Sequence, residues 1–161
     1  MPAFVKNAVA LGLRGASALS FLAPLLTRIT VGYSFFLTGR GKLGDLEAFT
    51  GYLQELGVPF ASAQAPFVAG LEFVGGMCLV VGLLTRLMSL GLLGTMVGAL
   101  LTAEKEGFLQ SWAPTGDVGP LDVDPWVFIL LLSWLVLHGP GVVSLDKPAS
   151  KLLGLTKDAS K

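Results

Sequence analysis

Two ionisable side chains, Arg28 and Glu72, interrupt apolar stretches of this chain. An ionised side chain at the centre of a bilayer costs about 2.5–3.5 kcal/mol even on a lenient insertion scale, so each needs a partner. In an antiparallel pair of helices their backbones would differ in depth by roughly 7 Å, which a long arginine can span. We therefore expect Arg28 and Glu72 to form an ion pair, with Arg40 and Lys42 as alternative partners of Glu72.

The buried polar site expected from Arg28, Glu72 and Lys42 has two interpretations. In the structural one, which we favour, the charges only lock two helices together, since buried ion pairs often specify packing or register. In the functional one, the site binds a quinone head group, a proton or a small anion. The sequence assigns no catalytic residue to either interpretation.

Other candidate ligands are few, because His138 is the sole histidine and Cys78 the sole cysteine. This excludes an intrachain disulfide, a CxxC redox pair and an all-cysteine metal site. His138 could be one haem ligand beside a ligand from elsewhere, but a hydrogen-bonded histidine at a helix end is favoured. We expect no metal and no cofactor bound by this chain alone, with quinone as the one cofactor still considered.

The elements that must position these residues are apolar helices. Of the 161 residues 53% are apolar and 14% are charged, whereas soluble domains average about 25% charged residues. Four segments suit a hydrocarbon core of about 30 Å: residues 19–39, 66–84, 87–103 and 126–143. Short connections make neighbouring segments antiparallel, so the expected fold is an all-α membrane protein with an up-down bundle of four transmembrane helices.

The longer connections have their own patterns. Residues 42–57 place leucines and Phe49 on one helical face, which predicts an amphipathic helix in the membrane interface, or else a surface helix packed on the bundle. Residues 104–125 predict a polar, acidic loop whose aromatic side chains suit the headgroup zone. We expect residues 1–146 to form one transmembrane domain and residues 147–161 a polar cytoplasmic tail.

Small residues mark possible close contacts between helices. Gly75 and Gly76 lie in the second segment, and Gly94 and Gly98 in the third have the GxxxG spacing. Helix packing within one chain is favoured over a dimer interface.

The distribution of basic residues predicts the orientation. With four spans, both termini share one side of the membrane with residues 85–86, and that side carries Lys6, Arg14, Arg86, Lys147, Lys151, Lys157 and Lys161. The opposite side has only Arg40, Lys42 and Lys105. The positive-inside rule then places both termini in the cytoplasm of a multi-pass protein in a bacterial-type cytoplasmic (inner) membrane. The zero net charge argues against a nucleic-acid partner.

Several short motifs occur in order along the chain: Arg28 with Gly32, Phe36, Gly39 and Lys42; Gly57-Val58-Pro59; E-x-x-G-G-x-x-L-x-x-G-x-x-T-R from Glu72 to Arg86; and G-x-G-x-x-S-L-D from Gly139 to Asp146. In this order they resemble the DoxX-like family of small integral membrane proteins. The resemblance implies a four-helix protein of the cytoplasmic membrane. Some relatives look like subunits of a thiosulfate:quinone oxidoreductase, and others are linked to redox or oxidative-stress assemblies.

Three functions remain open at this stage. The first is a membrane subunit or anchor of a quinone-linked redox complex, without a redox centre of its own. The second is a non-enzymatic accessory or scaffold subunit of a larger membrane assembly. The third, a small transporter, fits less well because four helices leave little room for a pathway. All three need the lipid bilayer, the first two also need other membrane protein subunits, and whether the chain is an enzyme is left undecided.

Overall fold

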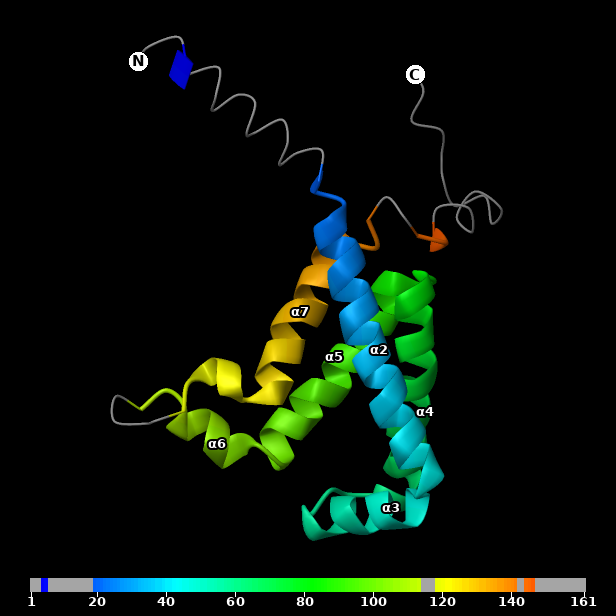
Figure 1. The fold of residues 1–161 in the computed structure, drawn as a ribbon. Coiled ribbons are helices and arrows are strands. Elements are labelled where there is room, and N and C mark those ends of the chain that lie inside the picture. The colour runs from blue at the N-terminus through cyan, green and yellow to red at the C-terminus, as the bar shows by residue number, and fades with distance from the viewer. Residues whose placement is uncertain (1–3, 6–18, 114–117, 142–143, 147–161) are drawn as a thin grey trace.

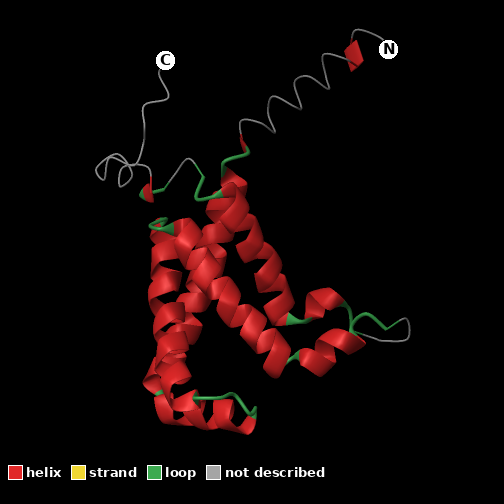
Figure 2. Cartoon of the chain, turned by 180° about the vertical axis from the view of Figure 1, so that it is seen from behind, coloured by secondary structure: helices red, strands yellow, loops and turns green. Residues whose placement is uncertain are grey.

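The structure, a computed structural model, describes residues 4–5, 19–113, 118–141 and 144–146, and within them the fold is helical without any strand (Figure 2). The longer helices of this part are α2 (Leu22–Gly44), α4 (Ala61–Val81), α5 (Thr85–Thr102) and α7 (Asp124–His138). Shorter elements connect them: α3 (Leu46–Glu55), α6 (Lys105–Gln110) and the 3₁₀ turn η1 (Pro120–Asp122). The predicted tail, residues 147–161, lies outside the described residues.

The longer helices form two pairs, α2 with α4 and α5 with α7 (Figure 1). At one end of the bundle, here the α4–α5 end, α2 begins, α4 turns into α5 and α7 stops. Toward the opposite end, here the α3–α6 end, the two pairs diverge. There α3 lies across the bundle and α6 projects to the side (Figure 1).

Close contact between backbones holds α2 against α4. A Cβ atom added to Gly39 would lie 2.3 Å from the backbone nitrogen of Phe73, and one on Gly76 would lie 2.4 Å from that of Phe36. Only glycine fits at such distances, and small residues are what allow helices in lipid to approach this closely. These contacts fix how far α2 can slide along α4.

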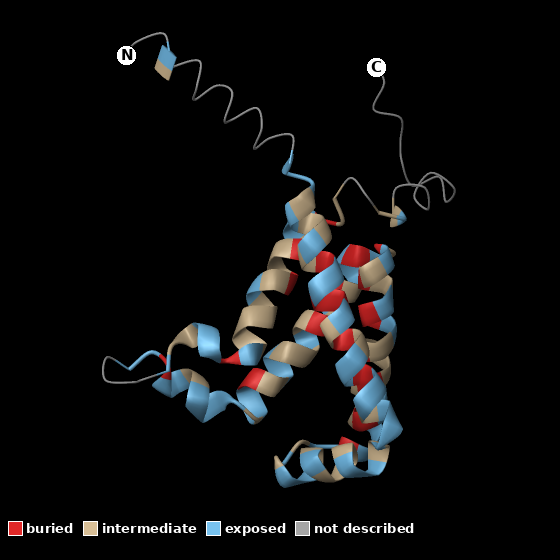
Figure 3. Cartoon of the chain, viewed as in Figure 1, coloured by how far each residue is buried: buried red, intermediate tan, exposed pale blue. Residues whose placement is uncertain are grey.

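A small apolar core joins the two pairs. Its buried residues come from all the longer helices: Val31 and Phe35 of α2, Leu79 of α4, Leu92 of α5 and Leu132 of α7. The ring of Phe35 also packs on Phe128, with centroids 5.1 Å apart. The buried positions follow the inward faces of the helices, while the outward faces stay exposed (Figure 3). The core, called the apolar layer below, closes the middle of the bundle.

Several predicted boundaries shift. The first segment, expected to end at residue 39, continues as α2 to Gly44, and the connecting helix expected over 42–57 is reduced to α3. Asp45 separates the two, and its carboxylate caps α3 by accepting a hydrogen bond from the Ala48 backbone at 3.0 Å. The last segment ends at His138, not residue 143, because Gly139 has φ of 78° and Pro140 cannot donate a helical hydrogen bond.

Two of the described helices, α4 and α5, are long and apolar enough to cross a membrane. The apolar α7 has 15 residues and is shorter than such a span. The all-α prediction is confirmed for the described part of the chain, whereas the four-span bundle stays a prediction.

The backbone contact between α2 and α4 can be tested with alanine. We expect Gly76→Ala to lower stability by about 1–3 kcal/mol, because its Cβ would meet main-chain atoms that cannot move aside. For a chain of this size each kcal/mol corresponds to about 2–4 °C in Tm, measurable by circular dichroism in detergent. Gly70→Ala on the same helix is the matched control, since a Cβ there meets nothing within 4 Å. Equal Tm values for the two variants would contradict the contact.

Candidate functional site

The buried carboxylate of Glu72 pairs with Lys42. Both oxygens of Glu72 lie 2.7 Å from Lys42 Nζ, and the two side chains are 1% and 29% exposed, respectively. Lys42 Nζ also lies 4.8 Å from the ring centroid of Phe49 in α3. The ammonium group of Lys42, near the end of α2, therefore contacts both the middle of α4 and the short helix α3.

The expected ion pair between Arg28 and Glu72 is wrong, although Lys42, one of the alternative partners, is correct. Arg28 lies at the α4–α5 end, where its guanidinium would touch a Cβ added to Gly82. Gly82 is roughly 15 Å along α4 from Glu72 at a rise of about 1.5 Å per residue. The prediction failed because it placed the end of the first segment, residue 39, at the same depth as the start of the second, residue 66. In the structure Gly39 packs against Phe73 instead.

A cavity of about 850 Å³ opens beside the ion pair, at the level where the helix pairs diverge. Its walls come from the end of α2, which contributes Lys42, from α3, from α4, which contributes Glu72, and from α5 and the start of α7. Most of the other lining residues are apolar or small, among them Leu53, Leu56, Phe67, Val68, Leu71 and Met96. Cavities of about 300–1,000 Å³ with apolar walls and a few polar groups are typical sites for small organic ligands.

Two glycines of α5 help to keep this cavity open. Gly94 and Gly98 line it, and a Cβ added to either would meet nothing within 4 Å. The expectation that the GxxxG pair packs against another helix of the same chain is therefore wrong for these positions. The expected packing between helices of the same chain is found instead at Gly75 of α4, where an added Cβ would lie 3.3 Å from the Leu92 side chain of α5. The difference arises because α5 separates from α4 toward the α3–α6 end.

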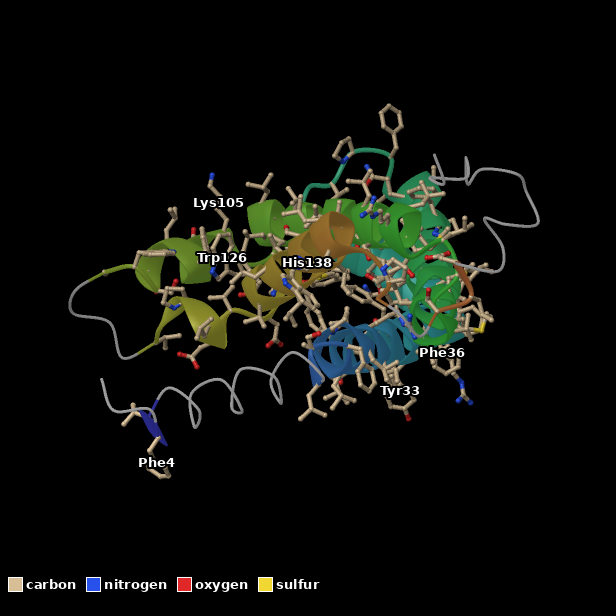
Figure 4. The ribbon with its side chains drawn as sticks, turned by 90° about the horizontal axis from the view of Figure 1, so that it is seen from above. Phe4, Tyr33, Phe36, Lys105, Trp126 and His138 are labelled. Carbon is tan, nitrogen blue, oxygen red and sulfur yellow. The ribbon has the colours of Figure 1, made fainter. Side chains whose placement is uncertain are left out.

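The predicted loop over residues 104–125 contains more structure than expected. It includes α6 and η1, and the rings of Phe108, Trp112 and Trp126 pack on one another at centroid distances of 5.1–6.5 Å. Trp126, near α6 in Figure 4, joins this group to the start of α7. Glu104 and Asp124 of the same region reach the cavity, so its rim is acidic.

A second polar region lies at the α4–α5 end. Arg28 Nη1 donates to the carbonyl of Pro140 at 3.0 Å. The Asp146 carboxylate accepts from the backbone nitrogens of Leu84 and Thr85, the latter at 3.0 Å, and thereby caps α5. The motif that ends in Asp146 is visible in the sequence, but its capping role is not, because the capped helix begins 61 residues earlier.

Four side-chain atoms of this region are buried and have no hydrogen-bond partner among the described residues: Arg28 Nε, Thr85 Oγ1, Ser89 Oγ and Ser144 Oγ. Leaving a buried polar group unpaired costs about 1–3 kcal/mol, and more for a charged one. We call Arg28, Thr85, Ser89 and Ser144 the Arg28 cluster. None of these four residues lines the cavity.

The remaining candidates form no site. The ring of His138 stacks on Trp134 of its own helix at 4.9 Å and is exposed at the end of α7. Cys78 is a free thiol in α4. Within the described ranges no three histidine, cysteine, aspartate or glutamate side chains gather as metal ligands.

A double-mutant cycle tests the assignment of Lys42 as the partner of Glu72. Lys42→Met strands a buried carboxylate, and breaking a fully buried pair costs about 3–5 kcal/mol. Because Lys42 is partly exposed, we expect the lower end of that range, with most of the loss recovered in Lys42→Met/Glu72→Gln. The measurement is the free energy of unfolding in detergent. Arg28→Met combined with Glu72→Gln serves as the control and should be additive. A larger coupling for the Arg28 cycle would contradict the assignment.

Comparison with known proteins identifies the family. The family model DoxX matches residues 23–105, from α2 to the start of α6.

"Putative oxidoreductase CatD" of Bacillus subtilis (strain 168) is 30% identical over 78% of this chain and 85% of its own length. "Inner membrane protein YqjF" of Escherichia coli (strain K12) is 30% identical over 79% of this chain and 92% of its own. "Uncharacterized membrane protein Rv3486" of Mycobacterium tuberculosis is 29% identical over 77% of this chain and 79% of its own length. No solved structure is significantly similar. The chain therefore belongs to the DoxX family of membrane proteins.

Proposed function

We propose that this DoxX-family protein is a membrane subunit or anchor of a quinone-linked redox complex, and that its cavity receives the quinone head group. One observation carries the proposal. The Lys42–Glu72 ion pair stands in the wall of an apolar cavity large enough for an organic ring.

The residues of the cavity fit this ligand class. A quinone head group carries carbonyl oxygens that accept hydrogen bonds, and Lys42 has three N–H donors, of which Glu72 does not need all. The reduced form carries hydroxyl groups that donate, and the Glu72 carboxylate can accept from them. The apolar side chains of α4 and α5 suit the ring itself. When bound, a quinone supplies two-electron redox chemistry; this chain would bind and orient it, and a partner subunit would hold the other redox centre.

We further propose that α2, α4, α5 and α7 all cross the bilayer, with the α4–α5 end toward the cytoplasm. An exposed apolar stripe on α2 supports a lipid-facing position: Leu26, Ile29, Tyr33 and Leu37 recur at helical spacing. Tyr33 points away from the other helices in Figure 4. In this orientation α3 and α6 lie at the opposite interface, and the cavity lies near it. The name of the Escherichia coli relative YqjF favours an inner membrane.

An accessory or scaffold role is the second candidate, and the segment from α6 to η1 favours it. Leu109, Trp112 and Leu121 there are 61–71% exposed beside acidic residues, as at a docking surface for another subunit. A transporter is less well supported, because the apolar layer closes the centre of the bundle.

Extraction of the native complex in mild detergent separates these candidates. Mass spectrometry of copurifying chains and an absorbance scan for haem or flavin are the readouts. A stoichiometric partner with a redox cofactor is the expected result. A stoichiometric partner without any redox centre would favour the scaffold, and a homogeneous, colourless chain alone would count against both roles.

Filling the cavity provides the direct test of ligand binding. In Gly94→Leu the new side chain would enter the cavity, and we expect affinity for decylubiquinone or menaquinone-4 to fall by about tenfold or more, measured by quenching of tryptophan fluorescence. The Tm should stay close to wild type, since there is open space at this position. Gly70→Leu is the matched control, because Gly70 has similar space but does not line the cavity.

Loss of the charge at Glu72 addresses the role of the ion pair. Glu72→Gln should lower quinone-dependent activity of the copurified complex while leaving its assembly intact. Unchanged affinity in Gly94→Leu together with unchanged activity in Glu72→Gln would exclude the cavity as the quinone site.

A further inference from the structure

We infer that the cavity opens sideways into the bilayer between α4 and α5, and that its ligand is a quinone with a hydrocarbon tail that lies in this opening. The opening, called the lateral mouth below, is marked by Phe67 of α4 and Leu90 of α5. The inference rests on the proposed function, which assigns the head group to the cavity. It adds the class of quinone and the route by which that quinone arrives.

The exposure of two lining residues locates the lateral mouth. Phe67 and Leu90 both line the cavity, yet they are 67% and 56% exposed. A residue that lines a cavity and also meets the surroundings lies where the cavity opens. Glu72 lines the same cavity but is 1% exposed, so it belongs to the inner wall. The cavity therefore has a buried carboxylate on its inner side and an apolar opening on its outer side.

The divergence of α4 and α5 leaves room for a chain in the lateral mouth. The two helices touch near Leu71 and Gly91, where a Cβ added to Gly91 would lie 3.3 Å from the Leu71 side chain. From there α5 separates from α4 toward the α3–α6 end (Figure 1). Gly94 and Gly98 line the cavity along the separating part, and a Cβ added to either meets nothing within 4 Å. At these two positions no side chain of α5 fills the space.

The lateral mouth lies on the two helices that are long and apolar enough to cross a membrane. Its two side chains are hydrocarbon. The acidic rim, with Glu104 and Asp124, instead lies where α5 ends and α7 begins, toward the α3–α6 end. If α4 and α5 span the bilayer as proposed, the lateral mouth faces lipid tails and the acidic rim faces the membrane interface.

An apolar opening into lipid selects a ligand that is dissolved in the bilayer. Lipid tails are as apolar as leucine, so a hydrocarbon chain gains little by leaving lipid for the protein. The head group can then reach Glu72 at least cost if the chain stays in lipid, which requires an opening at the depth of the ion pair. Leu90 lies at that depth, because its neighbour Gly91 packs on Leu71, the neighbour of Glu72. A quinone without a tail has no need of this route and can arrive by the acidic rim.

Photo-crosslinking locates the tail. The protein in phosphatidylcholine nanodiscs is irradiated with decylubiquinone that carries a diazirine in the middle of its chain, and labelled peptides are identified by mass spectrometry. We expect labelling at Phe67 and Leu90 or within one helical turn of them. Excess unlabelled decylubiquinone should reduce it by about tenfold, as mass action requires for a single shared site. Leu26 and Leu37 of the exposed α2 stripe report random contact with lipid, and labelling there should not respond to the competitor.

Narrowing the lateral mouth tests the route. We expect Leu90→Trp to weaken binding of decylubiquinone by about tenfold, because the larger ring would occupy space that the chain needs. Binding of the same head group without its decyl chain should stay within about twofold of wild type. Leu87→Trp is the matched control, since Leu87 lies on the same helix and is 60% exposed but does not line the cavity. Bound quinone is extracted from the nanodiscs and quantified, with empty nanodiscs subtracted.

The outcomes separate this inference from the proposed function. Equal effects of Leu90→Trp and Leu87→Trp, or competitor-sensitive labelling at the acidic rim alone, would overturn the lateral mouth and leave the quinone site standing. A diazirine-bearing phospholipid that labels Phe67 and Leu90 and is not displaced by decylubiquinone would assign the mouth to a membrane lipid and also overturn the inference. Binding of neither quinone to the wild type would refute the proposed function itself. If Leu90→Trp does not fold, the crosslinks of the wild type decide.

Discussion

The backbone contact between α2 and α4 determines where Lys42, Glu72 and Arg28 lie relative to one another. Gly32, Gly39 and Gly76 leave no room for a side chain between the two helices, so the register has one solution. In that register Lys42 reaches Glu72 near the α3–α6 end, and Arg28 reaches Gly82 and Pro140 near the α4–α5 end. A shift by one helical turn would separate both sets of partners and leave the buried charges of Arg28 and Glu72 unpaired, which is costly. Packing and electrostatics therefore specify the same arrangement.

The bundle satisfies its two polar regions in different ways. At the α3–α6 end a carboxylate and an ammonium neutralise each other directly, and the space beside them is large and apolar. At the α4–α5 end main-chain atoms contribute most of the bonds: the Pro140 carbonyl accepts from Arg28, and the amides of Leu84 and Thr85 donate to Asp146. The first arrangement leaves donors and acceptors for a ligand. The second ties the segment after α7 to the turn between α4 and α5.

The sequence was sufficient for the all-helical fold and for locating the residues with buried charge, because apolar periodicity and isolated charges are local signals. Lys42 was named as a partner of Glu72 but could not be ranked above Arg28, since the ranking depends on the register of two helices distant in sequence. The cavity arises from the divergence of α5 from α4, for which exposed glycines at 94 and 98 give no unambiguous signal. The capping role of Asp146 joins residues 61 and 62 positions apart, beyond the reach of any local capping pattern.

The apolar layer has a consequence for the response of the protein to membrane voltage. One elementary charge moved across a potential of 100 mV changes its energy by about 2.3 kcal/mol. The layer itself, formed by Val31, Phe35, Leu79, Leu92 and Leu132, carries no charge, and on its α3–α6 side Lys42 and Glu72 neutralise each other. If the helices span the bilayer as proposed, a change of potential exerts no net force on either feature, so the apolar layer and the ion pair should keep their arrangement over the range of potentials that a cell imposes.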